Sequence, residues 1–125
     1  MKVFVYYNLH KHCWSVKALE GDNKGRVVAH ADTVLVYAAQ PRVSQRGRER
    51  VLRTKQKNVH AGIVGWVNLD NLSNGYTQKD IDGWVEITYN PYLYTGFVVK
   101  SNPCEMFVGL ADCYMSNRKV FHRDC

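Results

Sequence analysis

Apolar residues alternate with other residues in short runs along most of the chain, and turn-forming residues separate the runs. In residues 2–8 both alternating faces are apolar, as expected of a strand inside a sheet. The later runs are residues 13–19, 26–30, 33–39, 58–69, 84–89, 93–100, 105–110 and 119–122. The first four runs are joined by short links, which predicts an antiparallel meander.

The period changes in one segment only. Ser44 is a suitable N-cap, and the adjacent apolar residues Val51 and Leu52 fit a period of 3.6 better than a period of 2. We therefore predict an α+β fold, in which an antiparallel sheet of about seven or eight short strands carries one main basic helix over residues 44–57.

The length of 125 residues predicts a single globular domain over residues 1–125. No apolar run approaches the ~20 residues of a membrane helix, and the first residues do not resemble a signal peptide. We expect a cytoplasmic protein with reduced cysteines and no membrane partner. The oligomeric state is left open.

The net charge is concentrated in the segment predicted to be helical. Residues 42–57 hold seven of the 17 Lys and Arg residues and one of the 11 Asp and Glu residues, which gives +6, the formal charge of the whole chain. On a helix the side chains of Arg46, Arg50, Arg53 and Lys57 would form one stripe. Because clustered guanidinium groups favour phosphate, this stripe predicts an anion site. The alternative is an ordinary solvated face.

Other residues extend this predicted site. Arg48 belongs to the same cluster, and Asn58 and His60 follow it directly; a histidine there suits phosphate binding or acid–base chemistry. Tyr92 and Tyr94 flank an Asn-Pro turn and are candidates for stacking on bases, although a packed core corner is the competing interpretation.

The sequence favours neither a metal centre nor a cofactor. The histidines and cysteines at 10, 12, 13, 104, 113, 122 and 125 lack the paired spacing of zinc ligands. Nucleotide-binding glycine loops and hydrolase motifs are also absent from the sequence, so we expect a binding protein more than an enzyme.

Three sequence segments carry a resemblance: Gly47-Arg-Glu-Arg-Val-Leu-Arg53, then Lys57-Asn-Val-His-Ala61, and later Tyr89-Asn-Pro-Tyr92. Together they resemble a family of small accessory proteins of tailed bacteriophages, over roughly residues 2–97. The resemblance brings no activity with it. It implies a phage protein that acts in the bacterial host cytoplasm, on host nucleic acid, enzymes or nucleotide signals.

The function predicted from these observations is binding of a phosphate-bearing ligand, either nucleic acid or a nucleotide, in a role that counteracts host defence. Two alternatives stay open. One is inhibition of a host protein through an acidic surface on that protein. The other is a small nuclease or transferase that uses His60 with an arginine clamp.

Overall fold

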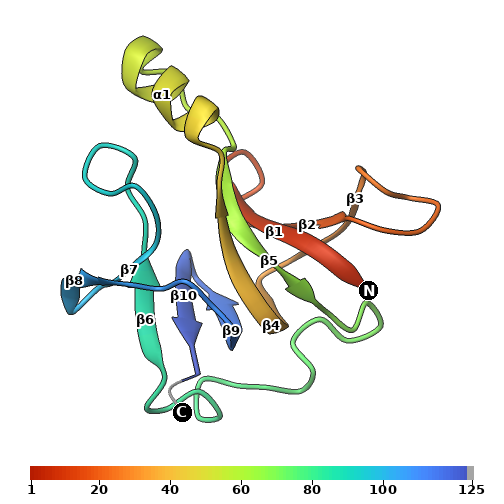
Figure 1. Cartoon of the computed structure of the whole chain (residues 1–125). Helices are drawn as coiled ribbons and strands as arrows, with labels where there is room; N and C mark the ends of the chain where they lie inside the picture. The colour runs from red at the N-terminus through yellow and green to blue at the C-terminus, as the bar shows by residue number, and fades with distance from the viewer. Residues whose placement is uncertain (124–125) are drawn as a thin grey trace.

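The computed structural model describes residues 1–123, and in them the chain is mostly antiparallel β-sheet with one short helix (Figure 1). The predicted α+β class, with seven or eight strands and a main helix, is therefore wrong. The elements are β1 (Lys2–Asn8), β2 (Cys13–Ala18), β3 (Val27–Ala31), β4 (Thr33–Val43), α1 (Gln45–Thr54), β5 (Ala61–Trp66), β6 (Val85–Thr88), β7 (Val98–Val99), β8 (Asn102–Met106), β9 (Ala111–Ser116) and β10 (Lys119–His122).

The strand count differs from the prediction mainly near the C-terminus. The single strand predicted over residues 105–110 is replaced by β8 before residue 107 and β9 after residue 110. All five residues of β8 are exposed, so this edge strand carries no apolar alternation that a sequence pattern can detect. In β9 three consecutive residues, Cys113, Tyr114 and Met115, are buried, which also hides a period of 2.

The strands lie in the order β3-β2-β1-β5-β4-β9-β10-β6-β7-β8, and neighbours pair in antiparallel fashion. The first three strands form the predicted meander. The fourth does not join it, because β5 pairs with β1 and separates β1 from β4. The chain leaves β4 through α1 and returns as β5, so α1 sits at the end of this strand pair (Figure 1).

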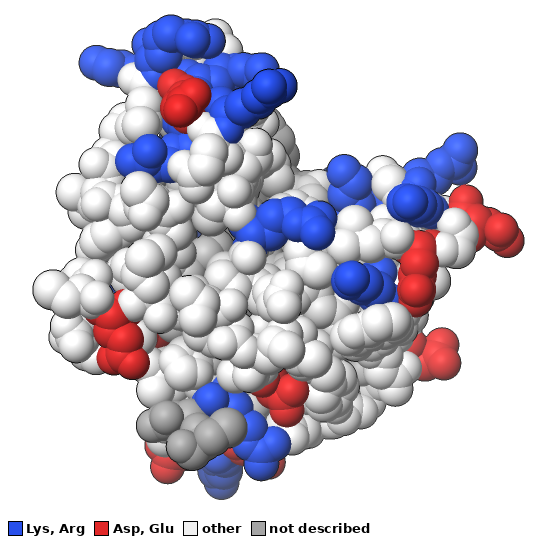
Figure 2. All heavy atoms as spheres, in the orientation of Figure 1, with Lys and Arg blue, Asp and Glu red and all other residues white. Residues whose placement is uncertain are grey.

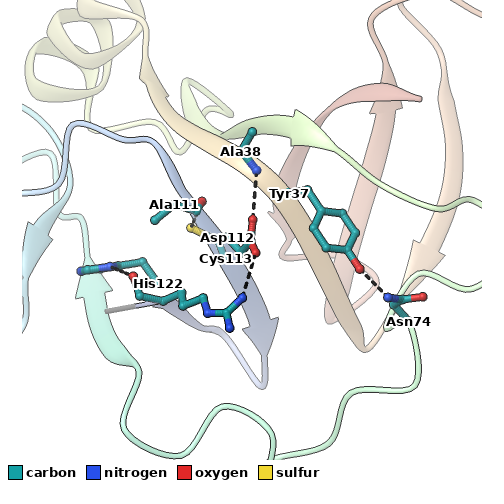
Figure 3. Close-up of polar contacts among 8 residues, drawn as sticks. Tyr37, Ala38, Asn74, Ala111, Asp112, Cys113 and His122 are labelled. Carbon is teal, nitrogen blue, oxygen red and sulfur yellow. Dashed lines mark hydrogen bonds and ion pairs between the residues drawn. The ribbon is translucent and has the colours of Figure 1, made fainter. Parts of the chain in front are cut away.

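Strand β4 bends and belongs to both halves of the sheet. Its first part pairs with β9 and its last part with β5, and both registers shift around Ala38, which has φ 50°. The Ala38 amide donates a hydrogen bond to the Asp112 side chain at 3.2 Å, and Asp112 also pairs with Arg123 at 3.6 Å (Figure 3). A bulge bends its strand and increases the local twist, so the irregularity at Ala38 accounts for the bend that lets β4 pair with both β5 and β9.

Both halves contribute to one apolar core. Its members include Val5 from β1, Ile63 from β5, Ile87 from β6 and Met115 from β9. A smaller cluster around Leu35 lies under the long connection between β5 and β6. Within residues 1–123 no helix has the length and apolar character needed to cross a membrane.

Helix α1 is shorter than the predicted 44–57. Ser44 is its N-cap, as predicted, and the Ser44 hydroxyl accepts a hydrogen bond from the Gly47 amide at 3.2 Å. The helix ends because Lys55 takes the left-handed conformation at φ 58°, and the Lys55 amide donates to the Val51 carbonyl. The chain from residue 55 to residue 60 then runs outside regular structure, toward β5.

Candidate ligand groove

An open groove of about 700 Å³ lies where three segments meet. One wall is residues 6–10, at the end of β1 and in the turn that follows. The second wall is the end of α1 together with residues 57–61, and the third is residues 89–92, which follow β6. The groove brings together parts of the chain as far apart as Tyr6 and Tyr92, and none of the three segments forms it alone.

Local hydrogen bonds hold two of the walls in shape. The Asn8 side chain accepts bonds from the amides of His10 and Lys11, each at 3.0 Å, which fixes the turn after β1. The Asn90 side chain accepts from the Tyr92 amide at 2.9 Å, and the Asn90 carbonyl accepts from the Tyr94 amide at 2.8 Å. Such bonds are the usual reason that asparagine occurs in turns.

His60 and Tyr89 join the second and third walls. The Nδ1 atom of His60 lies 3.0 Å from the Asn58 carbonyl oxygen, and the Nε2 atom lies 2.8 Å from the Tyr89 hydroxyl. Because a carbonyl only accepts, Nδ1 carries a proton, and in the tautomer protonated at Nδ1 alone the Nε2 atom accepts from the Tyr89 hydroxyl. Burial raises the pKa of the Tyr89 hydroxyl, an effect that the Arg48 guanidinium partly offsets. The hydroxyl therefore remains a donor at neutral pH.

The groove offers aromatic rings and cations, and within residues 1–123 no carboxylate side chain lines it. Its lining includes the four tyrosines Tyr6, Tyr7, Tyr89 and Tyr92 and the two lysines Lys55 and Lys57. Tyr92 is the most open of the tyrosines, at 57% exposed, and both lysines are exposed. An anionic ligand with a planar ring fits this combination of side chains.

Of the residues predicted to bind ligand, the structure brings four to the groove: Lys57, Asn58, His60 and Tyr92. Lys57 lies beyond the end of α1, so the prediction that it belongs to the helical stripe with Arg46, Arg50 and Arg53 is wrong. The first three members remain on the helix.

Two predicted residues have structural contacts instead. The Nε atom of Arg48 donates to the Tyr94 carbonyl oxygen at 3.1 Å, which ties α1 to the segment after β6. The Gln45 side chain makes a similar bond to the Thr95 carbonyl, also at 3.1 Å. Neither Arg48 nor Tyr94 lines the groove.

The three remaining predicted residues, Arg46, Arg50 and Arg53, are exposed and do not line the groove. At 100° per residue their side chains share one face of α1, and the buried Val51 lies on the opposite face. Figure 2 shows Lys and Arg side chains gathered over α1, whose sequence contains Glu49 as its one acidic residue. Two ion pairs occur in residues 1–123, Lys100–Glu86 and Arg123–Asp112, and neither involves this cluster.

Sequence analysis missed the groove residues contributed by β1 and its turn, among them Tyr6, Tyr7 and His10, as well as Lys55 and Tyr89. The motif around Tyr89 and Asn90 was a visible signal. The sequence contains no comparable signal for residues 6–10, because they approach residues 57–61 only through the pairing of β1 with β5.

The arrangement of His60 gives little support to acid–base catalysis. Both ring nitrogens already have partners within the protein, and the arginines at 46, 50 and 53 do not line the groove. Among residues 1–123 no three His, Cys, Asp or Glu side chains gather as metal ligands. Cys13, Cys104 and Cys113 are not paired with one another, and Cys125 lies outside the described residues.

Comparison with known proteins identifies the family. The sequence model of the family described as "Mycobacterium phage L5 gene 82 protein" matches residues 1–123. The Gene 82 protein of Mycobacterium phage L5 is 41% identical over 126 residues, an alignment that covers 96% of this chain and 94% of that protein. The chain belongs to the gene 82 family.

Membership of the gene 82 family confirms the predicted resemblance to tailed-phage proteins. It also extends that resemblance, because the match continues past residue 97 through β8, β9 and β10. No solved structure matches this member of the gene 82 family.

Proposed function

We propose that this phage protein binds a nucleotide-like ligand, a planar base that carries phosphate, in the groove between β1, α1 and the segment after β6. The observation that carries the proposal is the lining itself, in which the described part of the chain places four tyrosines and two lysines but no carboxylate side chain. Such a site pairs a stacking surface with cations, and its volume of about 700 Å³ lies in the range of small-molecule sites.

The parts of the groove have separable roles in this proposal. Tyr92, the most open ring, stacks on the base, while Lys55 and Lys57 neutralise phosphate. His60 positions Tyr89 and does not itself contact phosphate, because both of its nitrogens are engaged. In an infected cell, host nucleotides or host nucleic acid held in this groove would be withheld from host defence.

The test is a calorimetric titration at low salt with nucleoside monophosphates, cyclic nucleotides and the corresponding nucleosides without phosphate. Tyr92→Ala should weaken nucleotide binding by about 5- to 150-fold, which corresponds to ~1–3 kcal/mol of stacking. Leu93→Ala is the matched control, because Leu93 is the exposed neighbour at 69% and does not line the groove. If nucleotides and nucleosides bind equally, or if none binds at millimolar concentration, the proposal fails.

A second candidate function is binding of an acidic host protein by the surface around α1. It is favoured by the exposed Leu93, whose neighbour Tyr94 is hydrogen-bonded to Arg48 of α1, and by the exposed helix arginines, which form no ion pair with any residue in positions 1–123. A pull-down from bacterial lysate with the wild type and an Arg50→Ala/Leu93→Ala variant tests it. A partner that both proteins capture equally would contradict this use of the surface.

A further inference from the structure

The exposed arginines of α1 are followed closely in the chain by the two lysines that line the groove. Arg46, Arg50 and Arg53 lie along α1, and the seven helical steps from Arg46 to Arg53 extend about 10.5 Å along its axis. Lys55 follows Arg53 by two residues, so the Cα atoms of Arg53 and Lys55 are at most about 7.6 Å apart. Lys55 and Lys57 then line the groove. We call these five side chains the cation track: Arg46, Arg50, Arg53, Lys55 and Lys57.

Among residues 1–123, no ion pair neutralises the cation track. Glu49 is the one acidic residue between positions 42 and 57, and neither ion pair in the described chain involves a track residue. Exposed like charges in close succession repel one another, and an external anion relieves that repulsion. A single nucleotide in the groove can meet Lys55 and Lys57, but it leaves the three arginines without a partner.

From this arrangement we propose that the natural ligand is single-stranded nucleic acid, held by one nucleotide in the groove and by its phosphates along the cation track. The inference rests on the proposed function, since it places a nucleotide in that groove and adds the rest of the strand. A single strand combines the two features present here, which are rings for base stacking and cations that follow a backbone. A duplex presents phosphates but keeps its bases paired, so it cannot fill the tyrosine-lined groove.

The experiment is fluorescence anisotropy with labelled thymidine and uridine oligonucleotides of one to eight nucleotides, in the full chain at low salt. The DNA and RNA series distinguish the two sources of the same backbone chemistry. We expect affinity to rise with length up to about four or five nucleotides, and a duplex of equal length to bind more weakly than the single strand.

The decisive variant is Arg46→Ala/Arg50→Ala/Arg53→Ala, compared with Lys24→Ala/Arg26→Ala/Lys119→Ala. The control variant removes the same charge from exposed positions outside the track. At about threefold per exposed charge contact, the track variant should lose roughly 30-fold for an octanucleotide and little for a mononucleotide. The slope of log affinity against log salt should become shallower by about 2, at 0.7 per single-strand phosphate. The control should change both quantities less.

The outcomes separate the two proposals. If mononucleotides bind in the groove but longer strands bind no tighter, the strand inference is overturned and the groove proposal stands. Equal losses in the track and control variants would also overturn the inference, because they would show a general effect of charge. Strand binding that is insensitive to Tyr92→Ala would overturn the groove proposal and this inference with it.

Discussion

Gly47→Ala should destabilise this protein, although the same change in an ordinary helix is stabilising. Gly47 lies in α1, where alanine is favoured over glycine by about 1 kcal/mol. A Cβ atom at position 47 would lie 2.5 Å from the Cβ atom of His60 and 3.4 Å from the Ser44 hydroxyl oxygen. Carbon atoms pack best at ~3.5–4.0 Å, so the helix would have to move by about 1 Å.

Movement of His60 cannot relieve this contact. Its Cβ atom is fixed to the backbone, and the His60 carbonyl accepts a hydrogen bond from the Ser44 amide at 2.7 Å. Overpacking of this kind costs ~1–3 kcal/mol, which exceeds the gain in helix propensity. We expect Gly47→Ala to lower the free energy of unfolding by about 1 kcal/mol, measured by urea denaturation with tryptophan fluorescence.

A double-mutant cycle isolates the contact. His60→Gly removes the Cβ atom that the new methyl group would meet, so Gly47→Ala should then stabilise the protein by about 1 kcal/mol. The coupling energy between the two positions is therefore about 2 kcal/mol. If Gly47→Ala stabilises the wild type and the His60→Gly variant alike, the close approach of helix and strand is not what requires glycine.

Three further predictions concern the interior and the groove. Gly65→Ala should lower the free energy of unfolding by about 2–3 kcal/mol, because the new Cβ atom would strike the backbone of the bent β4 strand. Gly96→Ala is the comparison, because its Cβ atom would meet only the flexible end of Met106 and should change that free energy little. Thermal melts of the two variants test the difference. Burial, assisted by a neighbouring carboxylate, raises the pKa of Cys113 from 9.0 to about 12, so the folded state holds its proton where the unfolded state loses it. The free energy of unfolding should therefore fall by about 1.4 kcal/mol per pH unit between pH 9 and 12. In the Cys113→Ala variant this part of the pH dependence should disappear, as measured by urea denaturation at each pH. Tyr89→Phe removes the hydroxyl bonded to His60 and should cost about 1 kcal/mol by the same denaturation assay; an unchanged midpoint would contradict that hydrogen bond.

Local sequence signals determined several features of this protein. The alternation in residues 2–8 predicted β1, and Ser44 predicted the start of α1. Three of the predicted ligand-binding residues, Lys57, Asn58 and His60, occur within four positions, and all three line the groove; that they bind a ligand stays a prediction. Each of these features depends on hydrogen bonds or side-chain spacing within a few residues.

Tertiary structure decided what local patterns do not encode. Helix α1 ends where Lys55 takes the left-handed conformation. The sequence has no glycine or proline at this point that would predict the end of the helix. The exposed strand β8 is defined by its partner β7 and not by its own apolar pattern. The β1 wall of the groove exists because β5 inserts between β1 and β4, so that residues 6–10 meet residues 57–61. Strand order is set by burial summed over the whole sheet, and a groove between distant segments follows from that order.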